Sequence, residues 1–247
     1  MMQTFTYRTS QPIGFKAALG LIVLQSDETL EAEMRQMLPQ DGVALYVSRV
    51  PSAPDVTRET LAQMGPELRG AAGLLPPSLR YASVGYGCTS GASVIGAKEV
   101  AKSVQAGCDA QDVTDPMTAL VAACRALRVS RLAFLTPYIA QVSEGLRAAF
   151  DAQGITCTAL GSFNEAEEAK VARIDEGSIK EAALALGRSS DVDAVFLSCT
   201  NLRTLSIINK LEAELNLPVL SSNQVLGWHL MHLAGIKAQV PGRLGQL

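Results

Sequence analysis

The fold is decided by two similar stretches, YASVGYGCTSGASVIG at residues 81–96 and DAVFLSCTNLRTLSIIN at residues 193–209. Each reads as a short apolar strand, a cysteine, small hydroxyl or amide residues, and then apolar residues at helical spacing. Cys88 and Cys199 are therefore expected at strand-to-helix turns, on the carboxyl edge of a parallel sheet. Open α/β folds bind their ligands at that edge.

A helix N-terminus at each turn would change the acidity of the cysteine and would favour the binding of an anion. The first backbone amides have no partner within a helix, and the helix dipole is positive there. A cysteine at this point is expected to have a lowered pKa and to be partly thiolate near neutral pH. The same amides could hold a carboxylate, together with the side chains of Thr89, Ser90, Thr200 and Asn201. The alternative is that both cysteines are small core residues.

The order of the elements repeats along the chain. Cys199 follows Cys88 by 111 residues (199 − 88), and Leu135 follows Leu24, the end of the first apolar run, by the same interval (135 − 24). Alternating strands and helices predict parallel sheets with right-handed crossovers. We therefore predict an α/β protein with two pseudo-symmetric doubly wound lobes. Each lobe has a parallel sheet flanked by helices, and the active site lies in the cleft between them.

The predicted elements alternate in both halves. Strands are expected at residues 17–24, 42–50, 82–86, 131–135, 155–160, 194–198 and 217–221. Helices are expected after residue 27 and at 58–75 (interrupted near 65–66), after Cys88, at 117–127, 139–152 and 179–186, after Cys199, and at 224–233. Residues 106–116 are interpreted as a polar connection. By symmetry, residues 1–114 plus 224–247 form the first lobe, and residues 115–223 form the second.

The composition excludes several classes of protein. The chain has 247 residues, of which 48% are apolar and 18% are charged, as is typical of a globular enzyme. A net charge of −3 without a basic run argues against nucleic acid as a partner. No apolar run approaches the roughly 18 residues that span a membrane, and the start lacks a signal core, so a cytoplasmic location is expected.

Neither a metal nor a cofactor is expected. The five cysteines form no CxxC pair, and His229 and His232 have no visible third ligand, so we expect them to pack or to face solvent. The chain has no GxxxxGK[ST] loop, and residues 85–87 do not complete a dinucleotide fingerprint. The acidic run at Glu165, Glu167 and Glu168 is interpreted as a solvated surface. Two thiols facing a small molecule can transfer a proton or add to a double bond without a cofactor.

The cysteine motifs resemble those of a known superfamily. GYGCTSG around Cys88 and LSCTN around Cys199 resemble the paired motifs of the aspartate/glutamate racemase superfamily. LTPY, ending at Tyr138, and LSSNQ at residues 220–224 are similar to its maleate cis-trans isomerase branch. That branch also includes arylmalonate decarboxylases and ectoine-utilisation proteins. The resemblance covers roughly residues 17–235 and implies a two-lobed fold, cofactor-independent chemistry and a possible homodimer.

The resemblance also implies roles for individual residues. Cys88 corresponds to the nucleophile that adds to the alkene in maleate isomerases, and Cys199 corresponds to the acid and base. Tyr138 corresponds to a tyrosine that hydrogen-bonds a substrate carboxylate, and Asn164 is matched to an asparagine with the same role. Arylmalonate decarboxylases keep only the second cysteine, so the presence of both argues against simple decarboxylation.

Asp27 departs from the branch pattern, which has an asparagine after the first strand. An ionised aspartate would repel a substrate carboxylate by roughly 4 kcal/mol at a few ångströms. Asp27 could be protonated, could turn away as a helix cap, or could meet a substrate ammonium. The third possibility suits an amino acid better than maleate.

The sequence therefore favours an isomerase or racemase acting on a small carboxylate or amino acid, and the nearest named reaction is the conversion of maleate to fumarate. The alternatives are an amino-acid racemase, an ectoine-degradation enzyme, and a two-lobed binding protein without chemistry.

Overall fold

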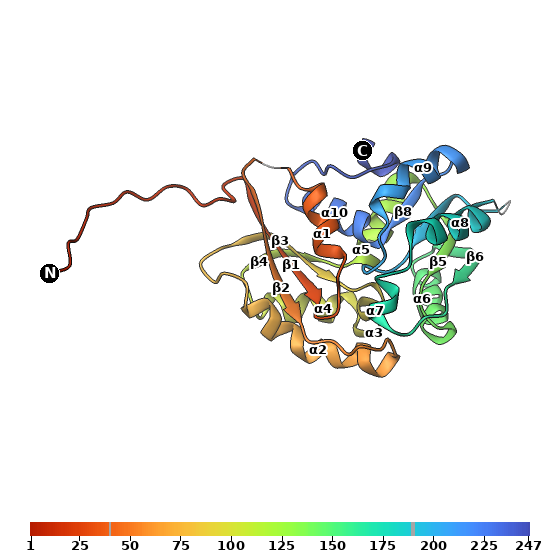
Figure 1. Cartoon of the computed structure of the whole chain (residues 1–247), viewed down its shortest axis with the longest axis horizontal. Coiled ribbons are helices and arrows are strands. Elements are labelled where there is room, and N and C mark those ends of the chain that lie inside the picture. The colour runs from red at the N-terminus through yellow and green to blue at the C-terminus, as the bar shows by residue number, and fades with distance from the viewer. Residues whose placement is uncertain (40, 189–190) are drawn as a thin grey trace.

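The computed structural model describes residues 1–39, 41–188 and 191–247. Within these residues, two four-stranded sheets lie side by side, with helices against them (Figure 1). The strand orders are β2-β1-β3-β4 and β6-β5-β7-β8, and every pairing in both sheets is parallel. The two sheets have the same order of connection, which confirms the predicted α/β class with two pseudo-symmetric lobes.

The elements follow one another in the order expected for such a duplication. The first sheet contains β1 (Ala17–Leu24), β2 (Val43–Val50), β3 (Tyr81–Gly87) and β4 (Ala110–Thr114), and the second contains β5 (Arg131–Thr136), β6 (Thr156–Ser162), β7 (Ala194–Leu197) and β8 (Val219–Ser221). The helices are α1 (Leu30–Met37), α2 (Arg58–Gly73), α3 (Thr89–Ile95), α4 (Ala97–Gln105), α5 (Pro116–Leu127), α6 (Ala140–Asp151), α7 (Glu168–Val171), α8 (Glu176–Gly187), α9 (Leu205–Leu215), α10 (Ser222–Leu233) and the 3₁₀ turn η1 (Arg243–Gln246).

The continuous apolar runs form the inner strands of each sheet. All eight residues of β1 are buried, and β1 lies between β2 and β3. In the second lobe, Phe134 of β5, Phe150 of α6 and Phe196 of β7 pack together, with ring centroids 5.2 to 6.0 Å apart. Parallel strands covered on both faces require such runs.

Two local predictions are wrong. Residues 106–116 contain the edge strand β4, which can be polar because most of its residues are exposed or only partly buried. The helix expected to break near residues 65–66 continues as α2 through Pro66. Its buried residues Leu61, Met64 and Leu68 pack along one face, and this packing offsets the hydrogen bond that proline cannot donate.

Helix α10 crosses from the second sheet to the first. It begins directly after β8 and packs against β3, β4 and α5. The Ser83 hydroxyl of β3 donates a 2.6 Å hydrogen bond to the carbonyl oxygen of Leu230. This packing agrees with the prediction that residues 224–233 belong to the first lobe, whereas the N–H groups of Gly242 and Arg243 donate to Asn209 and Glu212 of α9, in the second lobe.

Candidate active site

Cys88 lies at the turn between β3 and α3, as predicted. It is the N-cap of α3, and its Sγ accepts a 3.1 Å hydrogen bond from the backbone N–H of Gly91. A Cβ atom at Gly91 would lie 2.4 Å from the Tyr86 hydroxyl and 2.9 Å from Cys88 Sγ. Only glycine therefore lets this turn close around the sulfur.

Cys199 lies between β7 and α9, at a strand-to-helix turn as predicted. The helix α9 begins only at Leu205, so the expected helix N-terminus at the cysteine itself is wrong. The Cys199 backbone has a φ of 130°, a region that costs a residue other than glycine about 1–3 kcal/mol. Ser222 Oγ fixes this backbone by accepting a 3.0 Å hydrogen bond from the Cys199 N–H.

One direct hydrogen bond and one link through Ser222 join the two cysteine turns. Thr200 Oγ1 donates to the carbonyl oxygen of Gly87, the residue before Cys88, at 3.2 Å. Thr89 Oγ1 lies 2.8 Å from Ser222 Oγ, which also accepts from the N–H of Cys199. The carboxyl edges of the two sheets therefore meet, and both sulfurs belong to one site.

Tyr138 contacts a cysteine directly. Its hydroxyl donates a 2.9 Å hydrogen bond to Cys199 Sγ, which also accepts from the Asn201 N–H at 3.3 Å. Tyr138 follows β5 and is 2% exposed. The sequence predicted a bond from this tyrosine to the substrate, and the structure directs it to the sulfur.

Asp27 takes one of the roles considered for it, that of a cap at the start of a helix, with one of its two oxygens. Its Oδ1 caps α1 by accepting 2.8 Å hydrogen bonds from the N–H groups of Thr29 and Leu30. Its Oδ2 is buried and has no hydrogen-bond partner among the described residues. Burial raises the pKa of this carboxyl, and the hydrogen bonds from the N–H groups of Leu30 and Thr29 oppose that shift in part.

Glu168 is a site residue that the sequence reasoning missed. It is 4% exposed, so the prediction of a solvated acidic run is wrong at this position, whereas Glu167 is exposed. Its Oε2 accepts a 2.9 Å hydrogen bond from Asn201 Nδ2. Burial raises the pKa of Glu168 to about 7.

Two loops from opposite lobes bring Glu168 to the cysteines. The Val56 N–H donates to the carbonyl oxygen of Ala166 at 3.1 Å, and the Glu168 N–H donates to that of Pro54 at 3.1 Å. These contacts link loops more than 100 residues apart in the chain. No local pattern around Glu168 signals them.

The remaining predicted binding residues differ in their availability. The Asn201 side chain is engaged within the protein, since Oδ1 accepts from the Glu28 N–H at 2.9 Å and Nδ2 donates to Glu168. Ser90 Oγ lies 3.8 Å from Cys88 Sγ. Asn164 is exposed and has a left-handed φ of 55° in the loop after β6. Asn164 is thus the one predicted site residue that is exposed, whereas the others are buried around the two cysteine turns.

Both thiols have a raised pKa, contrary to the prediction. Cys88 and Cys199 are each 2% exposed. Burial raises the pKa of Cys88 to about 12 and that of Cys199 well above its usual range. The negative charge of Glu168 adds to both shifts, and the N–H of Gly91 only partly opposes the shift at Cys88. Desolvation therefore outweighs the helix N-terminus in this closed arrangement.

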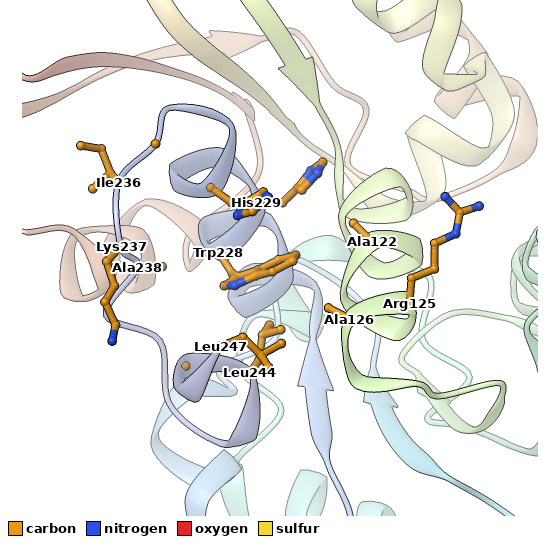
Figure 2. Close-up of a pocket in the computed structure, with 13 residues that line it drawn as sticks. Ala122, Arg125, Ala126, Trp228, His229, Ile236, Lys237, Ala238, Leu244 and Leu247 are labelled. Carbon is orange, nitrogen blue, oxygen red and sulfur yellow. The ribbon is translucent and has the colours of Figure 1, made fainter.

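Two cavities differ in whether a predicted site residue lines them. One of about 320 Å³ reaches Ser90 and is also lined by Arg58 and Gln141. A larger one, about 770 Å³, lies between α5, α10 and the C-terminal segment, where Trp228 faces Ala122 and Ala126 (Figure 2). The larger cavity contains none of the predicted site residues.

The two histidines belong to that distant cavity. His229 Nδ1 lies 2.7 Å from Thr114 Oγ1, and burial lowers the pKa of His229 to about 4. His232 stacks on Trp228 with ring centroids 5.3 Å apart.

Across the described ranges, no cluster of three or more His, Cys, Asp or Glu side chains could hold a metal ion. In the same part of the chain, none of the helices combines the length and apolar character that a membrane crossing requires.

The chain is similar to known arylmalonate decarboxylases and maleate isomerases. The family model described as arylmalonate decarboxylase matches residues 99–247. An arylmalonate decarboxylase of Bordetella bronchiseptica is 33% identical over 135 residues, which cover 54% of this chain and 56% of that protein. A maleate isomerase of Nocardia farcinica is 28% identical over 239 residues, covering 91% of this chain and 92% of that protein.

A solved structure has the same fold. It is a cysteine-to-serine mutant of Nocardia farcinica maleate cis-trans isomerase with a covalently bound succinylcysteine intermediate. The TM-score is 0.84 at 24% identity, covering 93% of this chain and 98% of that chain.

Proposed function

Because this chain belongs to the arylmalonate decarboxylase family, we propose that it is a cofactor-independent enzyme that isomerises a small carboxylate with two cysteines. The nearest named reaction is the cis-trans isomerisation of maleate to fumarate. The observation that carries this proposal is the hydrogen bonding between the Cys88 and Cys199 turns, both directly and through Ser222. The 28% identity to a maleate isomerase over 91% of the chain supports it.

Cys88 is proposed as the nucleophile. After its thiol proton has passed to solvent, the Cys88 thiolate adds to one alkene carbon, and the neighbouring carbon takes a proton from Cys199, which gives a succinyl thioether with a single carbon–carbon bond. Rotation about that bond, return of the proton to Cys199 and departure of the Cys88 thiolate then give fumarate. The N–H of Gly91, 3.1 Å from Cys88 Sγ, stabilises the thiolate that attacks and leaves.

Cys199 is proposed as the acid and base. The Tyr138 hydroxyl donates to its sulfur, so Tyr138 stabilises the Cys199 thiolate formed when the proton moves to the substrate. The backbone held by Ser222 fixes the direction of that sulfur. Thr89, Ser90 and Thr200 are proposed to bind substrate carboxylates once the substrate displaces their present contacts, and Asn164 remains a prediction for the same role.

The test is the appearance of fumarate from maleate, followed in the wild type and in Cys88→Ser and Cys199→Ser. We expect activity in the wild type and a loss of several orders of magnitude in kcat in both variants, while Cys124→Ser stays active because Cys124 lies in α5. Unchanged fumarate formation in Cys88→Ser would refute the mechanism.

A second candidate function, amino-acid racemisation, is favoured by the unpartnered Oδ2 of Asp27. It predicts α-deuterium incorporation when amino acids are incubated with the protein in heavy water. Ectoine degradation, the homodimer and the cytoplasmic location remain predictions. The relatives reported above are enzymes, which argues against the purely binding alternative.

A further inference from the structure

Helix α1 carries a buried carboxylate to which the proposed mechanism gives no role. Glu33 is 7% exposed and belongs to the first lobe. Its Oε1 accepts hydrogen bonds from the N–H groups of Thr204 at 2.6 Å and Leu205 at 3.0 Å, at the start of α9 in the second lobe. Thr204 is the N-cap of α9 and makes no cap bond with its own side chain, so Glu33 takes that place from the other lobe.

The second oxygen of Glu33 reaches the Cys199 turn through an amide. Asn223 Nδ2 donates to Glu33 Oε2 at 2.7 Å and to the carbonyl oxygen of Thr200 at 2.9 Å. The opposite end of that amide, Asn223 Oδ1, is buried and has no partner among the described residues. Reversing the amide would bring this oxygen against two acceptors, so the bond to Glu33 sets its orientation and directs the other N–H to Thr200.

The two residues before α1 hold the same loop. The backbone N–H of Glu28 donates to Asn201 Oδ1 at 2.9 Å, and Thr29 Oγ1 donates to the carbonyl oxygen of Asn201 at 3.0 Å. The start of the first lobe's helix therefore bonds the loop directly at residues 201, 204 and 205, and through Asn223 at residue 200.

This loop depends on support from outside itself. Cys199 has a φ of 130°, and residues 199–204 belong to no helix or strand. The Cys199 N–H donates to Ser222 Oγ, next to Asn223 in the chain. A residue in such a region of φ keeps its conformation only where the surrounding structure imposes it.

The arrangement needs both oxygens of a carboxylate. Oε1 of Glu33 accepts from the start of α9, and Oε2 accepts from Asn223. A glutamine of the same shape has one oxygen and one NH₂ group, so it would leave either α9 or Asn223 without its acceptor.

We propose that Glu33 is a positioning residue that holds the Cys199 loop, from the opposite lobe, in the conformation that directs the sulfur of Cys199 into the site. Glu33 contacts neither thiol and acts through Thr204 and Asn223. The effect on turnover rests on the proposed two-cysteine function, whereas the effect on the loop does not.

Hydrogen exchange at single backbone amides, followed by NMR, tests the effect on the loop. In Glu33→Gln the protection of the Cys199 amide should fall at least about tenfold, because a hydrogen bond to a charged group is lost, while the amides of β7 keep their protection. Unchanged protection at Cys199 would overturn the proposal. An equal fall throughout β7 would also overturn it, because it would show a general loss of stability.

The control is Glu31→Gln, the same substitution in the same helix. Glu31 pairs with Arg35 and Arg49 of its own lobe, so this variant should leave the Cys199 amide protected. A fall as large as that in Glu33→Gln would contradict the specific role of Glu33.

A second variant, Asn223→Ala, keeps Glu33 at the start of α9 and removes the link to Thr200. It should also lower the protection of the Cys199 amide, and it decides the question if Glu33→Gln does not fold. Unchanged protection at Cys199 in Asn223→Ala would overturn the proposal.

The fumarate assay separates this inference from the function proposed above. If both are correct, Glu33→Gln should lower kcat about tenfold or more at saturating maleate, and Glu31→Gln should not. A wild type that makes no fumarate, with the Cys199 loop released in Glu33→Gln, would overturn the isomerase proposal and keep the role of Glu33 in the loop. An active wild type whose kcat is unchanged in Glu33→Gln would keep the isomerase proposal and overturn the positioning role.

Discussion

The hydrogen bond between Tyr138 and Cys199 provides the most discriminating single substitution. Tyr138→Phe removes the 2.9 Å bond to Sγ and keeps the ring in its buried place. A hydrogen bond to a charged group contributes about 1.5–3 kcal/mol, so the thiolate at Cys199 loses about 2 kcal/mol of stabilisation. At 1.4 kcal/mol per factor of ten, kcat should fall about thirtyfold.

The assay is steady-state isomerisation of maleate across a range of pH. Because the Tyr138 hydroxyl lowers the pKa of Cys199, its removal should also move any limb of the pH profile that reports the Cys199 thiolate to higher pH. Tyr46→Phe makes the same chemical change at a partly buried tyrosine of β2 and should leave kcat unchanged.

The split between kcat and KM decides the role of Tyr138. A fall in kcat with KM unchanged fits action through the sulfur. A rise in KM with kcat unchanged would refute our reasoning and favour the role implied by the family resemblance, a bond from Tyr138 to the substrate carboxylate.

Two further substitutions test the site and its burial. Gly91→Ala places a Cβ 2.4 Å from the Tyr86 hydroxyl, so we expect a loss of activity and a free energy of unfolding in urea that is lower by about 2 kcal/mol. The control is Gly145→Ala in α6, where the added Cβ meets open space and should stabilise the protein by about 0.5 kcal/mol. Because the folded pKa of Glu168 is raised from 4.5 to about 7, its contribution to stability is complete below pH 4.5 and is lost as the pH rises through 7. The free energy of unfolding should therefore decline by at most about 3 kcal/mol over that window, and Glu168→Gln should flatten the decline; an unchanged slope would contradict the burial of an ionisable group there.

The sequence predicted those features that depend on local pattern. The buried runs of β1 and β7, the cysteine at the start of α3 and the repeat of 111 residues (199 − 88) led to the correct class and to the facing cysteine turns. The polar edge strand β4 was missed because a strand whose side chains are mostly exposed or only partly buried needs no apolar run.

The errors at the site have a different cause, which is burial by distant parts of the chain. Glu168 looks like part of a solvated run, and only the contact between the loops at Val56 and Ala166 takes it out of water. The thiol pKa of Cys88 was expected to fall because the helix N-terminus is local and visible in sequence, whereas the desolvation that outweighs it comes from the closure of two lobes. Pairwise contacts across more than 100 residues leave no periodic signal.

The most direct test of the two-cysteine site is the mass of the Cys199→Ser variant after incubation with maleate. We predict a stable adduct equal in mass to one maleic acid, located by peptide mapping on the peptide that carries Cys88, because solvent can supply the proton that completes the addition while the base for the reverse proton transfer is missing. Full isomerase activity without any adduct, or an adduct confined to Cys108, Cys124 or Cys157, would contradict the account.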